Sequence, residues 1–270
     1  MDRVAVRRRD RHRDETVSRE HDRKEDPSEG TRAAAEFVGT FFLVFVAAGA
    51  DIIHAKSGGA ITQTSRYLAP GLLIAALTWA LSGVSGAHIN PAVTFAFLLR
   101  RTFPAARAVR YWAAQFAGAI VAALVLRLFF GALIVKGANH PGIGISSVAA
   151  GAWEALLTLL LLLVILGTSE NEAVVGKNAA LAVGLTVALA GLFSSPVSGA
   201  SMNPARSLGP MLVAWQLQDS WIYLIGPLAG AAAAVVIGAL LFGRPRASEV
   251  ETAHGKHPKP DAAVAGSGRR

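Results

Sequence analysis

The feature that most constrains the fold is a series of six long apolar blocks. They span roughly residues 33–54, 67–86, 108–133, 149–168, 178–197 and 221–243. A helix needs about 20 apolar residues to cross the hydrocarbon core of a bilayer, and each block is about that long. Because no water is available there, the backbone polar groups of each block must bond within it, which requires helices. The blocks therefore predict an all-α membrane protein with six transmembrane helices.

The two ends of the chain differ in character from the apolar blocks. Residues 1–31 carry many charges of both signs, and residues 244–270 are polar, basic and rich in Gly and Pro. Such segments bury too little apolar surface to fold by themselves. We therefore expect a disordered tail over 1–31, a membrane domain over 32–243 and a second disordered tail over 244–270.

The net charge of +8 could indicate nucleic-acid binding. The basic residues, however, lie mostly in the tails and beside helix ends, which fits contact with membrane lipid and no nucleic acid. The chain has no cysteine, and no group of His, Asp and Glu has the spacing of metal ligands. We therefore expect neither a metal nor another cofactor. No pair of nucleophile and base points to an enzyme.

Lys and Arg also predict the orientation in the membrane. One side carries few of them, namely Lys56, Arg66 and Lys136. The other side carries the Arg-rich N-terminal tail together with Arg100, Arg101, Arg107, Arg110, Arg244 and Arg246. Loops rich in Lys and Arg stay in the cytoplasm. Both termini are therefore expected in the cytoplasm of a multi-pass protein of the plasma membrane, which agrees with an even number of spans.

The chain repeats itself. When Gly71 is aligned with Gly184, Val-Ser-Gly-Ala at 84–87 falls on Val-Ser-Gly-Ala at 197–200, and Asn-Pro-Ala falls on Asn-Pro-Ala. Upstream, Glu36 and Glu154 match, each with a Thr four residues later. The repeats cover about 32–133 and 149–243. Because each contains three spans, the second is inverted, and inverted repeats place a permeation path between them, near the midplane.

The Asn-Pro-Ala triplets are the clearest motif. Their residues are Asn90, Pro91, Ala92, Asn203, Pro204 and Ala205, and each triplet precedes about ten mostly apolar residues, enough for half a bilayer. Asn is a preferred N-cap, and Pro is favoured at the first helical position. A single triplet would suggest an ordinary helix start. Two in register predict two re-entrant half-helices that meet by their N-termini.

This meeting point has electrostatic consequences. Each helix N-terminus carries about half a positive charge, so two of them oppose protons and cations. The side-chain oxygen of each Asn is expected to cap its own helix, which would leave its NH2 group free to donate to a passing oxygen. Such a site accepts small neutral solutes with hydroxyl or carbonyl oxygens and rejects ions.

Three ionisable residues inside the repeats need an explanation, since charge is expensive in a membrane. Glu36 and Glu154 could reach the interface, but their symmetry favours a structural role as acceptors for backbone N–H groups of the turns before the half-helices. Arg206 follows the second triplet, where the first repeat has Val93. This asymmetry favours a functional Arg that donates to solutes and repels cations, over a purely structural one.

These motifs resemble those of the major intrinsic protein family, the aquaporins and glycerol facilitators. The matching segments are Ala-Glu-Phe-Val-Gly-Thr at 35–40, Ser-Gly-Ala-His-Ile-Asn-Pro-Ala-Val-Thr at 85–94 and Ser-Gly-Ala-Ser-Met-Asn-Pro-Ala-Arg-Ser at 198–207. The resemblance implies six spans with two half-helices, a pore in each protomer and a homotetramer. It also implies that His88 lines the cytoplasmic half of the pore.

The resemblance further implies a selectivity filter formed by Pro70, Gly191, Ala200 and Arg206. Water-selective members have a bulky aromatic and a histidine where this chain has Pro70 and Gly191, so the filter is expected to be wide. Two alternatives remain open at Pro70: it lies in the first turn of the second span, or Tyr67 supplies an aromatic nearby. Ser207 matches water channels, whereas Tyr223 followed by Leu224 is similar to the plant nodulin-type subfamily.

The expected function is a passive channel for water and small uncharged solutes such as glycerol, urea or metalloid acids, closed to ions and protons. One alternative is a strict water channel narrowed by a residue from a loop. A remote alternative is a secondary transporter, for which Glu36 and Glu154 would have to bind a coupling ion.

Overall fold

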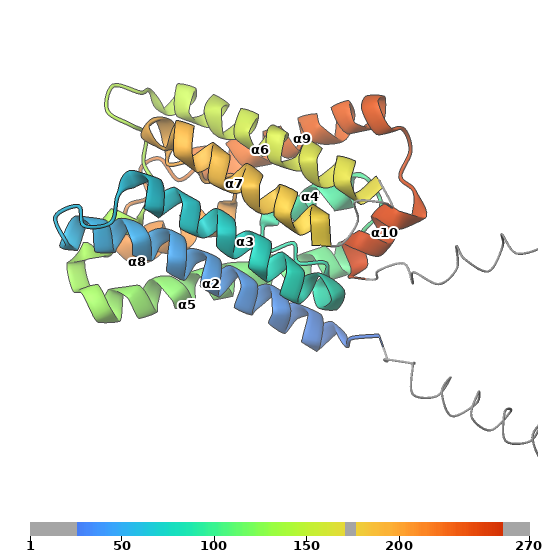
Figure 1. Cartoon of the computed structure of the whole chain (residues 1–270), viewed down its shortest axis with the longest axis horizontal. Helices are drawn as coiled ribbons and strands as arrows, with labels where there is room; N and C mark the ends of the chain where they lie inside the picture. The colour runs from blue at the N-terminus through green and yellow to red at the C-terminus, as the bar shows by residue number, and fades with distance from the viewer. Residues whose placement is uncertain (1–25, 171–176, 256–270) are drawn as a thin grey trace, which may run out of the picture.

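The computed structural model describes residues 26–170 and 177–255, and all regular secondary structure in this part of the chain is helical. Six of its helices are long and apolar enough to cross a membrane. They lie side by side along the long axis of the molecule (Figure 1). Their bounds are α2 (Glu29–Lys56), α3 (Gln63–Ser85), α5 (Ala105–Phe130), α6 (Ser147–Glu170), α7 (Lys177–Ser198) and α9 (Ile222–Phe242). The expected all-α membrane fold with six spans is confirmed.

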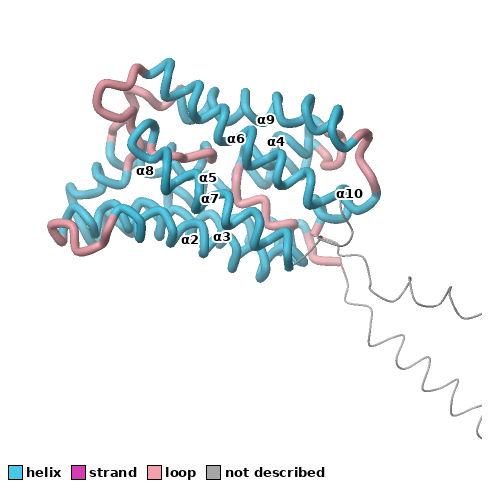
Figure 2. The backbone as a smooth tube through the Cα atoms, turned by 45° about the horizontal axis from the view of Figure 1, so that its top comes forward, coloured by secondary structure: helices cyan, strands magenta, loops and turns pink. Residues whose placement is uncertain are grey.

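Two short helices, α4 (Pro91–Leu99) and α8 (Pro204–Ala214), occupy opposite halves of the bundle. Figure 2 shows both, with the preceding loops reaching the middle. Each begins at the Asn-Pro pair, with Asn as N-cap and Pro in the first turn. Helix α4 packs against α9 of the other repeat, and α8 packs against α5. The two repeats are thus interlocked through their half-helices.

Helices α3 and α7, which are equivalent in the two repeats, pack closely because small residues lie between them. A Cβ added to Gly71 would lie 2.5 Å from the Cβ of Ala188, and one added to Gly184 would lie 2.6 Å from the Cβ of Ala75. Gly71 and Gly184 are the residues that the repeat aligns, as are Ala75 and Ala188. Larger side chains would push the two helices apart.

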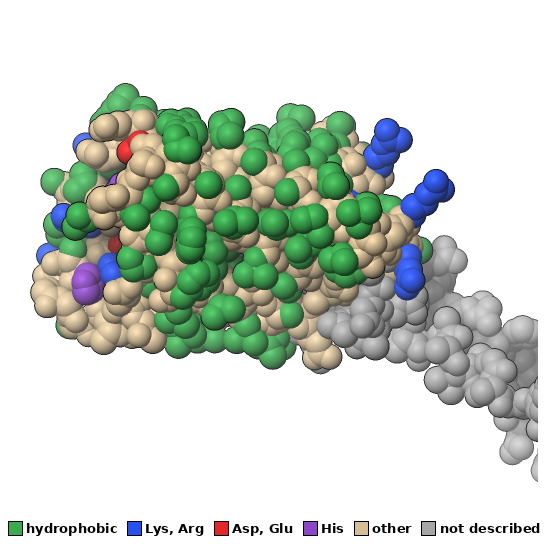
Figure 3. Space-filling view, turned by 90° about the horizontal axis from the view of Figure 1, so that it is seen from above, with side chains coloured by type: hydrophobic (Ala, Val, Ile, Leu, Met, Phe, Trp, Pro, Cys, Tyr) green, Lys and Arg blue, Asp and Glu red, His purple; other side chains and the backbone are tan. Residues whose placement is uncertain are grey.

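The two ends of the bundle differ. We call the end where α2 begins and α9 finishes the terminal end, and the other the opposite end (Figure 1). A 3-10 helix, η1 (Gly131–Gly137), follows α5 at the opposite end, and α10 (Ala247–His254) lies at the terminal end. Hydrophobic side chains cover the flank of the molecule, whereas Lys, Arg, Asp, Glu and His gather at its ends (Figure 3). This distribution is the one a bilayer requires.

Two expected boundaries are wrong. Helix α2 begins at Glu29, inside the expected N-terminal tail, because the side chain of Ser28 caps it and accepts from the N–H of Thr31 at 3.1 Å. Within 244–270, Ala247–His254 form α10, which buries Ser248 and Glu249 rather than extending into solvent. The rest of the expected tails, 1–25 and 256–270, lies outside the described residues.

Candidate functional site

Glu36 organises the turn before the first half-helix. Its side chain is fully buried and accepts hydrogen bonds from Ser85 Oγ at 2.7 Å and from the backbone N–H groups of His88 at 3.0 Å and Ile89 at 2.6 Å. Gln115 Nε2 donates a fourth bond at 2.7 Å. All four partners are donors, which matches an ionised carboxylate.

Glu154 repeats this arrangement in the second half. Its carboxylate is fully buried and accepts from Ser198 Oγ at 2.6 Å and from the backbone N–H groups of Ser201 at 2.9 Å and Met202 at 2.7 Å. These three donors are the repeat counterparts of the donors to Glu36. Neither carboxylate reaches the interface, so both act as acceptors for the turns, as the repeat predicts.

The bonds to these carboxylates hold a strained backbone. Ala87 and Ile89 have φ of 50° and 52°, and their counterparts Ala200 and Met202 have 49° and 55°. A left-handed conformation costs about 1–2 kcal/mol in a residue with a Cβ, and more in a branched one such as Ile89. Hydrogen bonds to a charged group offset this cost, and the strain turns each loop toward the midplane.

The two Asn side chains join the half-helices to each other. Asn90 Oδ1 accepts from the N–H of Ala92 at 2.8 Å, and Asn203 Oδ1 accepts from the N–H of Ala205 at 3.1 Å. Asn90 Nδ2 donates to the carbonyl of Met202 at 2.8 Å, and Asn203 Nδ2 donates to the carbonyl of Ile89 at 2.9 Å. The expected caps are present, but the expectation of a wholly free NH2 group is wrong, because one N–H of each serves the crossed link.

A cavity of about 120 Å³ runs between the repeats and contains most of the expected site. Asn90, Asn203 and His88 line it. So do the four residues expected to form a filter, Pro70, Gly191, Ala200 and Arg206. The remaining triplet residues are buried behind the lining, where they build the helix starts: Pro91, Ala92, Pro204 and Ala205.

Arg206 is held by groups from two other segments. Its Nη1 donates to Asn139 Oδ1, and its Nη2 lies 3.6 Å from Asp51 Oδ2. Asp51 also pairs with Arg66, whose Nη1 lies 3.0 Å from Asp51 Oδ1. The other end of the Asn139 amide donates to Ser207 Oγ at 2.8 Å. The guanidinium is thereby fixed at the wall of the cavity, and part of its charge is compensated by Asp51.

The space beside Gly191 is occupied by an aromatic side chain. A Cβ added to Gly191 would lie 2.7 Å from the Cβ of Tyr67 and 3.1 Å from its ring. The guanidinium of Arg66 lies 5.2 Å from the centre of the same ring, and Tyr67 lines the cavity. Of the two alternatives at Pro70, the first is wrong, because Pro70 lies inside α3 rather than in its first turn. The lack of a side chain at Gly191 is what makes room for Tyr67.

His88 lies between the half-helices and the terminal end. Its Nδ1 is 3.0 Å from Thr94 Oγ1, and its Nε2 is 3.1 Å from the carbonyl oxygen of Ala253 in α10. The rings of Phe97, Phe103 and Tyr111 surround it, with centres 4.7–5.2 Å from its own. Both nitrogens of the imidazole are therefore engaged in this structure.

Asp51 and Asn139 were missed by the sequence analysis, although they hold the Arg that it found. A signal for Asp51 was available, since it is an acid near the end of an apolar block, where charge is expensive. Asn139 follows η1 in a connecting segment with no periodicity, and nothing in the sequence links it to Arg206. The contacts of α10 with His88 also lacked a signal.

Comparison with known proteins agrees with this geometry. Residues 25–238 match the family model described as major intrinsic protein. Aquaporin NIP1-1 of Oryza sativa subsp. japonica is 42% identical over 201 residues, covering 74% of this chain and 70% of the relative. Aquaporin NIP2-2 of Zea mays is 38% identical over 209 residues, covering 76% and 69%.

The fold also matches a solved structure. The X-ray structure of the aquaglyceroporin from Plasmodium falciparum superimposes with a TM-score of 0.71 at 24% identity, covering 80% of this chain and 97% of that one. The curated relatives carry the nodulin-type name that the sequence resemblance indicated. The chain therefore belongs to the major intrinsic protein family, and it is a passive channel for water and small neutral solutes rather than an enzyme.

Proposed function

We propose that the solutes include glycerol, urea and other small uncharged molecules with several hydroxyl or carbonyl oxygens, alongside water. The observation that carries this proposal is the mixed character of the cavity wall. Arg206 offers fixed donors, whereas Pro70, Ala200 and the ring of Tyr67 are apolar. A solute with an alkyl side and an oxygen side can satisfy both surfaces at once, while a hydrated ion cannot. Undissociated metalloid acids fit the same chemistry.

The proposed selectivity filter comprises Pro70, Gly191, Ala200 and Arg206, with Tyr67 added from the structure. Ion and proton exclusion is assigned to the paired N-termini at Asn90 and Asn203, supported by the Arg charge. The carboxylate of Asp51 lies 3.6 Å from the guanidinium of Arg206 and compensates part of its charge. The N-termini of the half-helices therefore contribute more to ion exclusion than Arg206 does. Glu36 and Glu154 are engaged by donors from the turns, which supports a structural role over a coupling-ion site.

The second candidate is a strict water channel, which the position of Tyr67 beside Gly191 favours. The two are separated by water, glycerol and urea fluxes in proteoliposomes, measured for the natural chain and for Gly191→His. We expect glycerol flux in the natural chain and its loss in Gly191→His, with water flux retained. Leu192→His, at an exposed neighbouring position, is the matched control and should leave glycerol flux unchanged. Water flux without glycerol or urea flux in the natural chain would establish the alternative.

We further propose a homotetramer in the plasma membrane with both termini in the cytoplasm. The terminal end carries most of the basic side chains identified in the sequence, which supports this orientation. Arg127 adds one basic residue at the opposite end, near Val213, without reversing the balance. Protease digestion of an N-terminal tag in sealed inside-out and right-side-out vesicles tests the orientation, and native mass spectrometry tests the tetramer.

A further inference from the structure

The short helix α10 crosses the terminal end of the bundle and contacts the cavity itself. It packs against α3 and α6, and Thr252 on α10 lines the same cavity as His88 and Asn90. A Cβ added to Gly86 would lie 2.7 Å from the carbonyl oxygen of Ala253, so the helix approaches the turn before the first half-helix closely.

Docking of α10 removes a polar group from the lumen. The carbonyl of Ala253 can only accept, so the Nε2 of His88, 3.1 Å away, donates to it. The other nitrogen of His88 is bonded to Thr94, so no nitrogen of this ring is left for a solute while α10 is docked. In place of that donor, α10 brings the side chain of Thr252 to the cavity wall.

The opposite end of the cavity is built differently. The repeat counterpart of Gly86 is Gly199, and a Cβ added there would meet the side-chain amide of Asn139 at 3.1 Å. At this end the space beside the glycine is filled by the side chain of Asn139, which also holds Arg206. At the terminal end the equivalent space is filled by α10. The asymmetry indicates that α10 is an addition to the channel rather than a part of its symmetric frame.

The docked helix is fastened by a buried ion pair. Arg100 donates from Nε to Glu249 Oε1 at 2.9 Å and from Nη2 to Glu249 Oε2 at 2.5 Å, with side chains 2% and 0% exposed. Arg100 follows the last residue of α4, whereas Glu249 belongs to α10. The pair therefore ties α10 directly to the end of the first half-helix. Two-pronged pairs of this kind are strong and specific in geometry.

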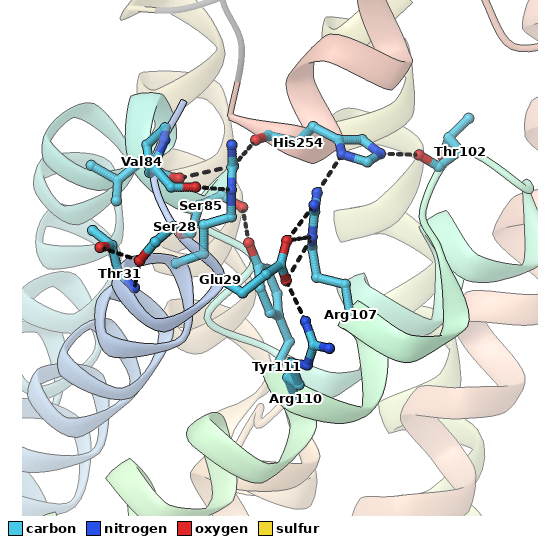
Figure 4. A network of polar contacts seen from close by, with 12 residues as sticks. Ser28, Glu29, Thr31, Val84, Ser85, Thr102, Arg107, Arg110, Tyr111 and His254 are labelled. Atoms are coloured by element: carbon cyan, nitrogen blue, oxygen red, sulfur yellow. Dashed lines mark hydrogen bonds and ion pairs between the residues drawn. The ribbon is translucent and has the colours of Figure 1, made fainter. Parts of the chain in front are cut away.

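A second set of contacts holds the other end of α10, and Figure 4 shows it from close by. Arg107 Nη1 lies 2.5 Å from His254 Nδ1, and His254 Nε2 lies 3.1 Å from the carbonyl oxygen of Thr102. Arg107 also pairs with Glu29 at 2.5 Å, and Arg32 donates to the carbonyl of His254. The start of α2, the start of α5 and α10 are thereby joined in one network.

The docked state also carries a cost. Among the described residues, the buried hydroxyl oxygens of Ser248 and Thr252 have no hydrogen-bond partner. Unsatisfied buried hydroxyls oppose burial, so the ion pairs hold α10 against a tendency to leave. Release would return both hydroxyls to water and would free His88.

We propose that α10 closes the pore at the terminal end, that the pair of Arg100 and Glu249 holds it closed, and that flux rises when the pair is broken. This inference rests on the channel function and adds an element of control to it. The docked helix sets the narrowest point at that end, and undocking exposes His88 and opens the path. Because charges fasten it, charge reversal weakens the closure, whereas added salt screens this buried pair only weakly.

Three variants test the proposal through water flux in proteoliposomes. Glu249→Lys places two cations together and should raise flux about ten-fold, as expected if the undocked population grows from about a tenth to nearly all. Arg100→Glu combined with Glu249→Lys restores opposite charges and should return flux toward the natural value. Glu251→Lys makes the same charge change at a half-buried position of α10 and is the matched control, with flux unchanged.

A readout independent of flux uses the absence of cysteine from the chain. Thr252→Cys should react slowly with a water-soluble maleimide in the otherwise natural chain and at least several-fold faster when Glu249→Lys is added. A chain ending at Arg246, which lacks the whole helix, should conduct like Glu249→Lys and shows the open state if the point variant fails to fold. Equal flux and equal labelling in all variants would overturn the closure. Absence of flux from every variant, including the truncated chain, would instead contradict the channel function.

Discussion

The matched carboxylates offer an internal comparison, because the same substitution can be made in both repeats. Glu154→Gln replaces one carboxylate oxygen, which accepts hydrogen bonds, with an NH2 group. That NH2 group can only donate, and the groups around it are donors too. In the better orientation the new NH2 group replaces the oxygen that accepts only from Met202. One bond to a charged group is lost, at about 1.5–3 kcal/mol, and the buried NH2 group is left unsatisfied, at about 1–3 kcal/mol more. We expect a total loss of about 2.5–6 kcal/mol.

Glu36→Gln should cost less. Its neighbour Gln115 already carries a buried side-chain oxygen without a partner among the described residues. A flip of the Gln115 amide turns that oxygen toward the new NH2 group. The bonds then lost are the one from the N–H of Ile89 to the carboxylate and the neutral one from Gln115 Nε2 to Thr94 Oγ1. The expected loss is about 2–4.5 kcal/mol, the value of one bond to a charged acceptor and one neutral bond.

Thermal unfolding in detergent, followed by the fluorescence of the five Trp residues, measures the difference. Each kcal/mol corresponds to about 2–4 °C in Tm for a chain of this size, so the Tm of Glu154→Gln should fall by about 10 °C and that of Glu36→Gln by a few degrees less. The turns would be distorted in both, and water flux should fall in the same order. Equal losses, or a larger loss for Glu36→Gln, would refute the role given to the Gln115 amide.

Two further predictions concern groups that frame the same sites. The hydroxyls of Tyr111 and Tyr223 each donate at 2.7 Å to a carbonyl of the turn in their own repeat; Tyr111→Phe and Tyr223→Phe should therefore each lower the free energy of unfolding by about 0.5–1.5 kcal/mol. Denaturant titration in detergent measures the two losses of unfolding free energy. If they differ by more than that range, the two hydroxyls are not equivalent. Asp51→Asn removes the carboxylate that fixes Arg206, and we expect glycerol flux to fall about ten-fold, equivalent to about 1.4 kcal/mol of solute stabilisation. Unchanged glycerol flux in stopped-flow light scattering would show that Asp51 does not position the Arg.

The spans and the half-helices could be predicted because local chemistry decides them. Apolar length and the absence of water in the bilayer specify the helices. The Asn-Pro pair specifies where Asn90 and Asn203 cap the two short ones, and the matched carboxylates were interpretable once the repeat was aligned. In each of these cases the decisive residues lie in one segment or at equivalent places in two.

The remaining features depend on contacts between segments far apart in the chain. Asp51 lies near the end of α2, Arg66 near the start of α3 and Asn139 in the segment after η1. The fold brings the first two together and places both Asp51 and Asn139 on Arg206. Helix α10 is eight residues long and carries two acids, so its composition resembles a solvated tail. An isolated helix of that length is not stable in water, and docking through Glu249 is what forms it.

The most direct test of the central claim is a paired measurement on the same proteoliposomes. Glycerol and water fluxes are followed by light scattering while an enclosed pH indicator reports proton entry, with and without an imposed pH gradient. For a passive channel that excludes ions, we expect glycerol flux to rise linearly with concentration and to be independent of the pH gradient. No proton entry should accompany it. Flux that saturates and depends on the pH gradient, or proton entry above that of empty vesicles, would contradict it.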